Sequence, residues 1–314
     1  MKIFVAGIQD AGARALLRQL TIDDDLWFAA APEFGRPDRD AFLEAEVVLG
    51  GFPLEMLGSA SRLRWIQLLA VGIDAYRSAN WPAVGGQVIC TNLRGVFAEP
   101  MAQSVLAGVL AFNRGIVAMV RLQDKGDWQK DYLHSQMRVL RHAHVLLLGG
   151  GSVGTRLREI FTLFGCTCSV YARTSGDVRT LAELDAALPK ADIVCAALPE
   201  TPATRGLLDA RRIALMKPDA LFANVGRGSL LDEQALVRAL QSNRLRGAVI
   251  DVTQREPLSP DHPLWKCPRI LLSQHSAAGS HDELSAAINF FGENLTRYRA
   301  GVPLVNAINW NKGY

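Results

Sequence analysis

Four polar side chains follow apolar runs in the second half of the chain, and their types suit acid–base chemistry. Arg227 follows "ALFANV", Asp251 and Glu256 follow "RGAVI", and His275 follows "RILLSQ". Histidine titrates near neutral pH and can give a proton to an oxygen that gains negative charge, while a nearby carboxylate orients the ring. Arginine offers a planar pair of donors to a carboxylate. The set suits hydride transfer to a 2-oxo acid, whose carbonyl oxygen becomes an alkoxide.

The apolar runs predict that these residues meet at one edge of a sheet. The runs are "AHVLLLG", "CTCSVYA", "ADIVCAAL", "DALFANV", "LRGAVIDV" and "RILLSQ", and helical patterns separate them. Continuously apolar strands that alternate with helices are typical of a doubly wound parallel sheet. The loops at the carboxyl ends of such strands open on one edge, where ligands bind. Taken singly, Arg227 could cap a turn, Glu256 could be solvated and His275 could bond a carbonyl; their shared edge favours catalysis.

A glycine-rich turn follows the first of these runs. Gly149, Gly151 and Gly154 form G-x-G-x-x-G between a strand and an amphipathic helix. This context predicts a dinucleotide site: Gly149 permits the tight turn, Gly151 lets the backbone approach a pyrophosphate, and Gly154 lets helix and strand pack closely. The backbone amides near Ser152 and Val153 would point at the phosphates. The alternative is a glycine-rich turn that binds nothing.

The stretch "YARTSG" bears on which dinucleotide is bound. A carboxylate about 20 residues after the glycines would hold the ribose hydroxyls of NAD. Ala172 stands there, followed by Arg173 and Thr174. An arginine can pair with a 2′-phosphate and a threonine can donate to it, so NADPH is expected to be preferred and NADH remains possible. The alternative is an ordinary surface arginine.

Length and composition agree with a two-domain globular protein. The chain has 314 residues, 49% of them hydrophobic and 21% charged, with a formal net charge of +3 and no basic tract, so neither nucleic acid nor an anionic membrane is expected as a partner. No signal peptide and no apolar run of membrane-spanning length are apparent, and the five cysteines lack the spacing of a zinc site, so a cytoplasmic protein without a metal is expected.

The first third of the chain predicts a smaller α/β domain. Its strand patterns are "KIFVAG", "AEVVLGG", "LRWIQLL" and "GQVICTN", and one long helix is expected from Ala98 to about Leu122. A closing helix, "HDELSAAINFFGENLTRYRAG", follows His275 and could return to the first domain.

These motifs together resemble the D-isomer-specific 2-hydroxyacid dehydrogenases, and among them the glyoxylate/hydroxypyruvate reductases. The stretches "GGGSVG", "LPETPATRGLLD", "ANVGRGSLLDEQAL", "IDVTQREPLSPDHPLW" and "SQHSAAGS" occur in the family's order, and the tail "NWNKGY" resembles that of the bacterial A-type enzymes. The resemblance implies a doubly wound Rossmann cofactor domain, 98–278. It also implies a smaller flavodoxin-like α/β substrate domain, 1–97, which 279–314 completes. A homodimer is implied too, with the helix after residue 98 at its interface.

The resemblance also assigns roles to single residues. Arg227 would bind the substrate carboxylate and carbonyl, Glu256 would be the partner of His275, and His275 would be the proton donor. In "LLAVGIDAY", the amides of Val71 and Gly72 would hold the substrate carboxylate.

Further residues would contact the dinucleotide. Leu198 and Pro199 would line its adenosine side. Val225 and Gly226 would lie near the nicotinamide, and Asp251 would lie against the carboxamide.

Four departures from the family's usual residues bear on substrate and rate. Gln274 replaces a usual proline and Thr253 a usual aromatic residue, while Gln103 and Arg94 replace a glutamate and a proline. The sequence therefore predicts an NADPH-dependent reductase of glyoxylate, hydroxypyruvate or a related 2-oxo acid. The alternative is a non-catalytic protein that senses dinucleotides on the same scaffold.

Overall fold

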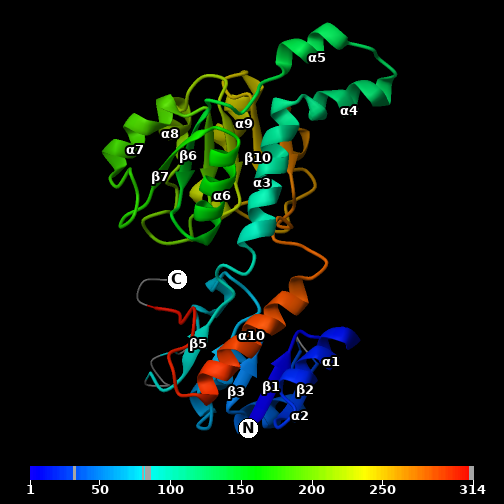
Figure 1. Cartoon of the computed structure of the whole chain (residues 1–314), viewed down its shortest axis with the longest axis vertical. Coiled ribbons are helices and arrows are strands. Elements are labelled where there is room, and N and C mark those ends of the chain that lie inside the picture. Colours follow the sequence, from blue (N-terminus) through cyan, green and yellow to red (C-terminus); the bar gives the residue numbers. More distant parts are fainter. Residues whose placement is uncertain (31–32, 80, 82–85, 311–314) are drawn as a thin grey trace. The chain divides into compact units, whose positions relative to one another are not determined.

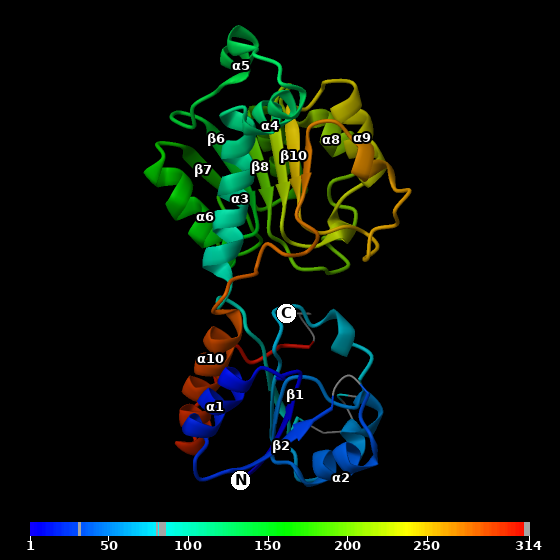
Figure 2. The ribbon, with the colours of Figure 1, turned by 90° about the vertical axis from the view of Figure 1, so that its right-hand side faces the viewer.

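The computed structural model describes residues 1–30, 33–79, 81 and 86–310, and these form two compact units. Unit 1 comprises Met1–Val96 and Ser280–Tyr314, and unit 2 comprises Phe97–Gly279. Each unit is built on a parallel sheet with helices on its faces (Figures 1 and 2). The predicted α/β class, with a doubly wound sheet and a second, smaller sheet, is confirmed.

Unit 1 has a five-stranded parallel sheet in the order β2-β1-β3-β4-β5 among its described residues. This is the strand order of flavodoxin-like folds. The strands are β1 (Lys2–Ala6), β2 (Asp25–Ala29), β3 (Val47–Leu49), β4 (Trp65–Gln67) and β5 (Ile89–Thr91). Helices α1 (Ala11–Leu20) and α2 (Arg36–Glu44) and the 3₁₀ turns η1 (Leu54–Ser59) and η2 (Asp74–Tyr76) connect them. Sequence reasoning missed β2, a short strand that directly follows an acidic stretch and whose residues alternate between exposed and half-buried before Ala29.

The closing helix α10 (Glu283–Arg299) packs on the sheet of unit 1. Phe291 and Tyr298 both stack on the buried ring of Trp65, with centroids 5.1 and 5.5 Å away. The buried amide of Asn294 donates to the side chain of Gln67 at 3.2 Å and to the carbonyl of Val305 at 3.0 Å. Stacked aromatic rings and satisfied buried amides thus tie the end of the chain to its beginning.

Unit 2 has a six-stranded parallel sheet among its described residues, in the order β11-β10-β9-β8-β6-β7. All six predicted runs are strands: β6 (His144–Leu148), β7 (Thr167–Tyr171), β8 (Ile193–Ala196), β9 (Leu221–Asn224), β10 (Gly247–Ile250) and β11 (Ile270–Leu272). A single parallel bridge from Tyr171 to Val178 lies beyond β7. It occupies the place of the third strand in the 3-2-1-4-5-6 order of dinucleotide-binding sheets.

Helices cover both faces of this sheet (Figure 2). One apolar cluster contains residues of α3 (Ala98–Asn113) and α6 (Ser152–Leu163), and another contains residues of α8 (Ala210–Leu215) and α9 (Glu233–Gln241). Helix α7 (Leu181–Ala187) and the 3₁₀ turns η4 (Leu188–Lys190), η5 (Gly228–Leu230) and η6 (Pro263–Lys266) complete the connections. Cover on both faces explains why the strand sequences are continuously apolar.

The single helix predicted from Ala98 to about Leu122 is wrong. Helix α3 ends at Asn113, Gly115 takes a left-handed φ of 71°, and α4 (Ile116–Lys125) leaves at an angle of 61°. The apolar pattern continues across Gly115, so it does not reveal the break. The helix ends because the backbone of Gly115 is left-handed. Helix α5 (Lys130–Gln136) follows, and α4 and α5 extend away from the sheet of this unit (Figure 1). Among the described residues no single helix is long and apolar enough to cross a membrane; only the bent pair α3 and α4 reaches that length and composition.

Candidate active site

The residues predicted for the dinucleotide and for catalysis follow the carboxyl ends of parallel strands in unit 2. Because those strands are parallel, their following loops share one edge. The glycine turn follows β6, the loop of Ala172 to Thr174 follows β7, Leu198 and Pro199 follow β8, Val225 to Arg227 follow β9, Asp251 follows β10, and His275 follows β11. The strand order reverses between β6 and β8, which is where ligands bind in such sheets.

The three glycines of the turn differ in what surrounds them. A Cβ atom on Gly154 would lie 1.9 Å from the carbonyl oxygen of Gly149, and one on Gly149 would lie 2.8 Å from that of Ala197. Around Gly151, by contrast, a Cβ atom would meet no described atom within 4 Å. The first and third glycines therefore permit close packing, and the second leaves open space. These surroundings fit a dinucleotide whose pyrophosphate approaches the turn.

The start of α6 fits the same ligand. Gly151 is the N-cap residue, and among the described residues no side chain caps this helix. Its first amides, including those of Ser152 and Val153, therefore have no side-chain acceptor. A helix N-terminus with free amides and the positive end of its dipole is suited to a phosphate group.

Two more loops lie directly against this turn. A Cβ atom on Gly150 would meet Ser175 Oγ at 3.1 Å and Ala172 Cβ at 3.2 Å, so the loop after β7 contacts the glycines. A Cβ atom on Gly226 would lie 2.6 Å from the carbonyl oxygen of Leu198, so the loops after β8 and β9 also meet. Arg173 and Thr174 are both exposed in the loop after β7. The residues predicted for the dinucleotide thus occupy adjacent loops.

His275 and Glu256 form a direct pair. The Nδ1 atom of His275 lies 2.6 Å from Oε2 of Glu256, and Oε1 of Glu256 accepts from the backbone amide of Thr253 at 2.9 Å. Because a carboxylate only accepts, Nδ1 must have a proton, and Nε2 remains for another partner. The side chains of His275 and Glu256 are 55% and 36% exposed, so the ring of His275 is open to solvent. This arrangement can hold a proton and present it to a ligand.

Asp251 holds the loop that bears His275. Its backbone oxygen accepts from the amide of His275 at 2.6 Å. Its Oδ1 atom accepts from Ser273 Oγ at 2.7 Å and from the amides of Ser276 and Ala277 at 2.9 and 3.0 Å. The side chain is buried, and three donors satisfy this one oxygen. The sequence did not predict this structural role of Asp251, because Asp251 and Ser273 are far apart in the sequence and only the fold brings them into contact.

The backbone at His275 is unusual for residues with a side chain. Gln274 and His275 have left-handed φ values of 55° and 57°. Proline is limited to a φ of about −65°. The proline that the family resemblance leads one to expect at position 274 could therefore not take the backbone conformation that Gln274 has here. Left-handed residues other than glycine are uncommon and concentrate at functional sites. The bonds from Asp251 hold this conformation in place.

Arg227 follows β9 in a loop fixed by a buried asparagine. Asn224 Nδ2 donates to the backbone oxygen of Arg227 at 3.0 Å, and its Oδ1 accepts from the amide of Gly226 at 3.1 Å. The Nη1 atom of Arg227 donates to the carbonyl of Gly226 at 2.7 Å, and the residue is half-buried. A Cβ atom on Gly228 would lie 2.0 Å from the backbone of Thr253, so the loops of Arg227 and Glu256 touch. Sequence reasoning missed Asn224, although a polar residue that ends an apolar run was a signal.

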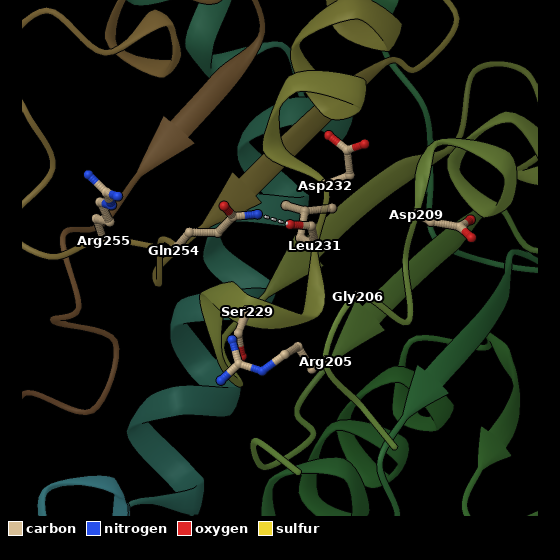
Figure 3. Close-up of a pocket in the computed structure, with 8 residues that line it drawn as sticks. All are labelled: Arg205, Gly206, Asp209, Ser229, Leu231, Asp232, Gln254 and Arg255. Carbon is tan, nitrogen blue, oxygen red and sulfur yellow. Dashed lines mark hydrogen bonds between the residues drawn. The ribbon is translucent and has the colours of Figure 1, made fainter. Parts of the chain in front are cut away.

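A pocket of about 400 Å³ lies beside these loops (Figure 3). Most of its polar side chains already have partners. Asp209 and Asp232 cap α8 and α9, Arg205 pairs with Glu200, and Gln254 donates to the carbonyl of Leu231. Arg255 and Asp209 lie at opposite sides of the pocket in the view shown. These groups do not converge on one point, so we place the candidate site at the glycine turn and His275.

Val71 and Gly72 lie in unit 1, in the loop after β4. Asn92 Nδ2 donates to the carbonyl of Val71 at 2.8 Å, and the amide of Leu93 donates to the carbonyl of Ala70 at 3.0 Å. The carbonyl groups of this loop thus face unit 1 and are satisfied there. Val71 is exposed and Gly72 is half-exposed, as a ligand-binding loop requires.

The remaining departures have local structural roles. Gln103 donates to Glu99 within α3 at 2.7 Å, and the Thr253 hydroxyl donates to the carbonyl of Arg255 at 2.8 Å. Arg94 is exposed, and its amide donates to Asn92 Oδ1 at 3.2 Å. None of these residues interrupts the pair of Glu256 and His275.

The cysteines are apolar packing residues. All five are free thiols, and burial raises the pKa of Cys166 to about 11 and the pKa of Cys195 still further. A thiol with a raised pKa is a poor nucleophile and a poor metal ligand at neutral pH. No group of His, Cys, Asp or Glu side chains among the described residues is arranged to hold a metal ion.

Comparisons with known proteins agree with this geometry. Residues 106–277 match the model of the D-isomer specific 2-hydroxyacid dehydrogenase, NAD binding domain. A glyoxylate reductase of Aeropyrum pernix is 30% identical over 269 residues, which cover 81% of this chain and 79% of that protein. A glyoxylate/hydroxypyruvate reductase B of Salmonella schwarzengrund is 31% identical over 290 residues, covering 88% and 89%.

A solved structure is similar over the whole chain. The D-isomer specific 2-hydroxyacid dehydrogenase of Xanthobacter autotrophicus Py2, in complex with NADPH and MES, has a TM-score of 0.84 and 28% identity, and the match covers 100% of this chain and 99% of that one. The chain belongs to the D-isomer specific 2-hydroxyacid dehydrogenase family, as its motifs predict, and is close to its glyoxylate/hydroxypyruvate reductases. The family's domain binds a nicotinamide dinucleotide. The predicted likeness to A-type enzymes depends on the tail, of which 311–314 lie outside the described residues.

Proposed function

We propose that this protein is an NADPH-dependent reductase of small 2-oxo acids such as glyoxylate or hydroxypyruvate. The observation that supports this most directly is the contact of His275 Nδ1 with Glu256, 2.6 Å long, on the edge where the glycine turn lies. Relatives named as glyoxylate and hydroxypyruvate reductases agree with it.

The residues of unit 2 would hold the dinucleotide along the sheet edge. Gly149, Gly151 and the amides of Ser152, Val153 and Gly154 would bind the pyrophosphate. Leu198 and Pro199 would line the adenosine side, Val225 and Gly226 would lie near the nicotinamide, and Asp251 would lie against its carboxamide. Bound NADPH would supply the hydride.

The protein's own part is to bind the 2-oxo acid and to provide a proton. Arg227 would bind the substrate carboxylate and carbonyl, with the amides of Val71 and Gly72 as further donors to the carboxylate. His275, protonated at both nitrogens, would give the Nε2 proton to the carbonyl oxygen as that oxygen becomes an alkoxide. Glu256 would hold the ring through Nδ1 and stabilise the charged imidazolium. Product would leave as the 2-hydroxy acid.

The preference for NADPH rests on the loop after β7. Ala172 provides no carboxylate for the ribose hydroxyls, and the exposed Arg173 and Thr174 offer donors to a 2′-phosphate. Hydrogen bonds to charged groups contribute about 1.5–3 kcal/mol, so we expect a preference of about ten- to a hundredfold in kcat/KM. The double change Ala172→Asp with Arg173→Ala should reverse the preference and leave the carbonyl chemistry intact. Equal use of both cofactors by the unmodified protein would contradict the role of Arg173.

The experiment that tests the function follows NADPH absorbance with glyoxylate, hydroxypyruvate, pyruvate and phenylpyruvate. We expect turnover with at least one of the two smaller polar acids. Tight NADPH binding without turnover across the panel would favour the alternative, a dinucleotide sensor on the same scaffold.

We further propose that the protein acts as a homodimer through the segment from α3 to α5. Helices α4 and α5 extend away from the sheet, and apolar side chains there are exposed; Trp128 alone is 90% exposed, with Val120 and Tyr132 nearby in the chain. These side chains would form one apolar patch, which would then be covered by a second copy of the chain. Sedimentation should give twice the chain mass of 34.2 kDa, and Val120→Asp with Trp128→Glu should give a monomer.

A further inference from the structure

Unit 2 contains a second pair of a carboxylate and an imidazole besides Glu256 and His275. Oε2 of Glu233, the first residue of α9, lies 3.5 Å from Nε2 of His262. The Glu233 side chain is only 8% exposed. Burying a carboxylate costs free energy unless donors satisfy its oxygens. The donors that contact Glu233 therefore indicate which part of the structure it fixes.

The other oxygen of Glu233 holds the turn that bears Glu256. Oε1 accepts from the backbone amide of Gln254 at 2.6 Å. The Gln254 side chain donates to the carbonyl of Leu231 at 2.5 Å (Figure 3). Gln254 is therefore fixed at its backbone and at its side chain. The preceding residue, Thr253, donates its amide to Glu256, so the position of Glu256 depends on this turn.

His262 has a defined protonation pattern in this arrangement. Its Nδ1 accepts from the amide of Leu264 at 3.4 Å and caps η6. Because a backbone amide only donates, Nδ1 has no proton, and in the neutral ring the proton must be on Nε2. Nε2 lies 3.5 Å from Oε2 of Glu233, a polar contact longer than a normal hydrogen bond. His262 thus stands next to the second oxygen of the carboxylate whose first oxygen holds Gln254.

A general role for Glu233 in helix stability explains less. Acidic residues in the first turn of a helix interact well with its dipole, and Glu183 does this in α7. Glu183 accepts from the amides of Arg179 and Thr180, at 2.7 and 3.1 Å, directly before its own helix, and is exposed. Glu233 is buried instead, and its oxygens face a different loop. The contrast indicates that Glu233 serves the turn at Gln254.

We propose that Glu233, oriented by His262, is a positioning residue that fixes the turn from Thr253 to Glu256 and thereby keeps His275 in its Nδ1–H form. The bonds run from Glu233 to the amide of Gln254, then through the adjacent amide of Thr253 to Glu256, and on to His275. The kinetic part of this inference rests on the proposed reductase function, and the tautomer of His275 does not.

The kinetic test compares Glu233→Ala alone and in the Glu256→Ala background. Small misplacement of a catalytic group can cost up to about a hundredfold in rate, so we expect Glu233→Ala to lower kcat by about tenfold or more, with the Kd for NADPH changed by less than about threefold. If Glu233 acts through Glu256, the two effects are not additive, and Glu233→Ala should cost less than about twofold in the Glu256→Ala background. Glu183→Ala is the matched control: it also removes a carboxylate that accepts from two backbone amides in unit 2, and it should leave kcat unchanged.

A milder variant keeps the test decisive if Glu233→Ala does not fold. In His262→Asn the side-chain oxygen replaces Nδ1 as the acceptor for Leu264, and only the contact with Glu233 is lost. We expect a several-fold loss of kcat that again vanishes in the Glu256→Ala background. Equal losses with and without Glu256, or an unchanged kcat, would overturn the proposal.

The tautomer of His275 gives a readout that needs no activity. Nitrogen-15 chemical shifts of the neutral ring, assigned with His275→Gln, should show the Nδ1–H form in the unmodified protein. Glu233→Ala and His262→Asn should shift the ring toward the Nε2–H form. An unchanged tautomer in both variants would overturn the proposal, whereas absence of turnover in the unmodified protein with a shifted tautomer would contradict the reductase function alone.

Discussion

The first strand–helix turn of unit 1 and that of unit 2 have the same topology and opposite local chemistry. After β1, Gly7 takes a left-handed φ of 86°, and Asp10 caps α1 by accepting from the amide of Ala13 at 2.7 Å. After β6, Gly149 has a φ of 122°, and Gly151 starts α6 with no side-chain cap among the described residues. The first turn brings its own anion to the helix end, and the second leaves that place for a ligand.

This difference separates fold from function. A parallel sheet of either order places loops at its carboxyl edge, but a helix end occupied by a carboxylate repels a phosphate. We therefore propose that unit 1 uses its first turn for stability and that unit 2 uses its own for binding. Changes at both turns and at the neighbouring strand ends of unit 2 can test this contrast.

The largest effect is expected at the strand end of β11, which has no counterpart among the five described strands of unit 1. His275→Gln removes the proposed proton donor, so kcat should fall by about 10²–10⁴-fold, the usual range for a positioned general acid. The Kd for NADPH should change far less. His142→Gln, at an exposed position before β6 and outside the proposed site and interface, is the control and should leave kcat unchanged. A near-normal kcat for His275→Gln would exclude the assignment.

The next effect comes from giving the second turn the cap of the first. Gly151→Asp has open space for its side chain and should cap α6, so the free energy of unfolding should not fall. The new carboxylate would repel the pyrophosphate and compete for its amides, and the Kd for NADPH should rise about ten- to a hundredfold.

Calorimetry measures the Kd for NADPH of Gly151→Asp, and denaturant titration of the same sample measures its free energy of unfolding. Gly151→Ala adds a Cβ atom without charge and should weaken binding much less. Unchanged affinity in Gly151→Asp would mean that phosphate does not bind at this helix end.

A smaller loss is expected from Arg227→Lys. The charge stays, but the planar pair of donors is lost, so kcat/KM should fall more than about tenfold, equivalent to about 1.4 kcal/mol of transition-state binding. Steady-state kinetics with the best acid of the panel measures this. Arg255→Lys, in the neighbouring exposed loop, is the control. Full activity of the lysine variant would show that Arg227 serves only the fold.

The smallest effect concerns the capped turn of unit 1. Asp10→Ala removes the acceptor for the amide of Ala13 and should lower the free energy of unfolding by about 1 kcal/mol. The Kd for NADPH should stay the same, and Asp23→Ala, an exposed carboxylate just beyond α1, should change neither quantity. Weaker NADPH binding in Asp10→Ala would contradict the separation of roles.

Sequence reasoning succeeded where chemistry follows from local pattern. The six strands of unit 2 were predicted from continuous apolar runs, and the glycine turn from its spacing. It failed at Gly115, whose backbone breaks a helix although apolar residues continue beyond it. It also failed at β2, a short apolar strand directly after an acidic stretch. The contacts of Asp251 and Glu233 could not be predicted, because they join residues that only the fold brings together. Those of Asn224 are local, and the polar residue at the end of an apolar run was a signal for them. The roles of His275 and Arg227 stay predictions.

The left-handed pair at Gln274 and His275 has a consequence for the exchange of residues between relatives. Consensus design would replace Gln274 by proline, whose ring excludes a φ of 55°. The whole loop would then have to adopt a new path, and the amide of His275 would leave Asp251. Gln274→Gly would instead relieve the backbone at no steric cost. At this position of the chain, a change to proline therefore cannot be a change of side chain alone, because the backbone path must change with it.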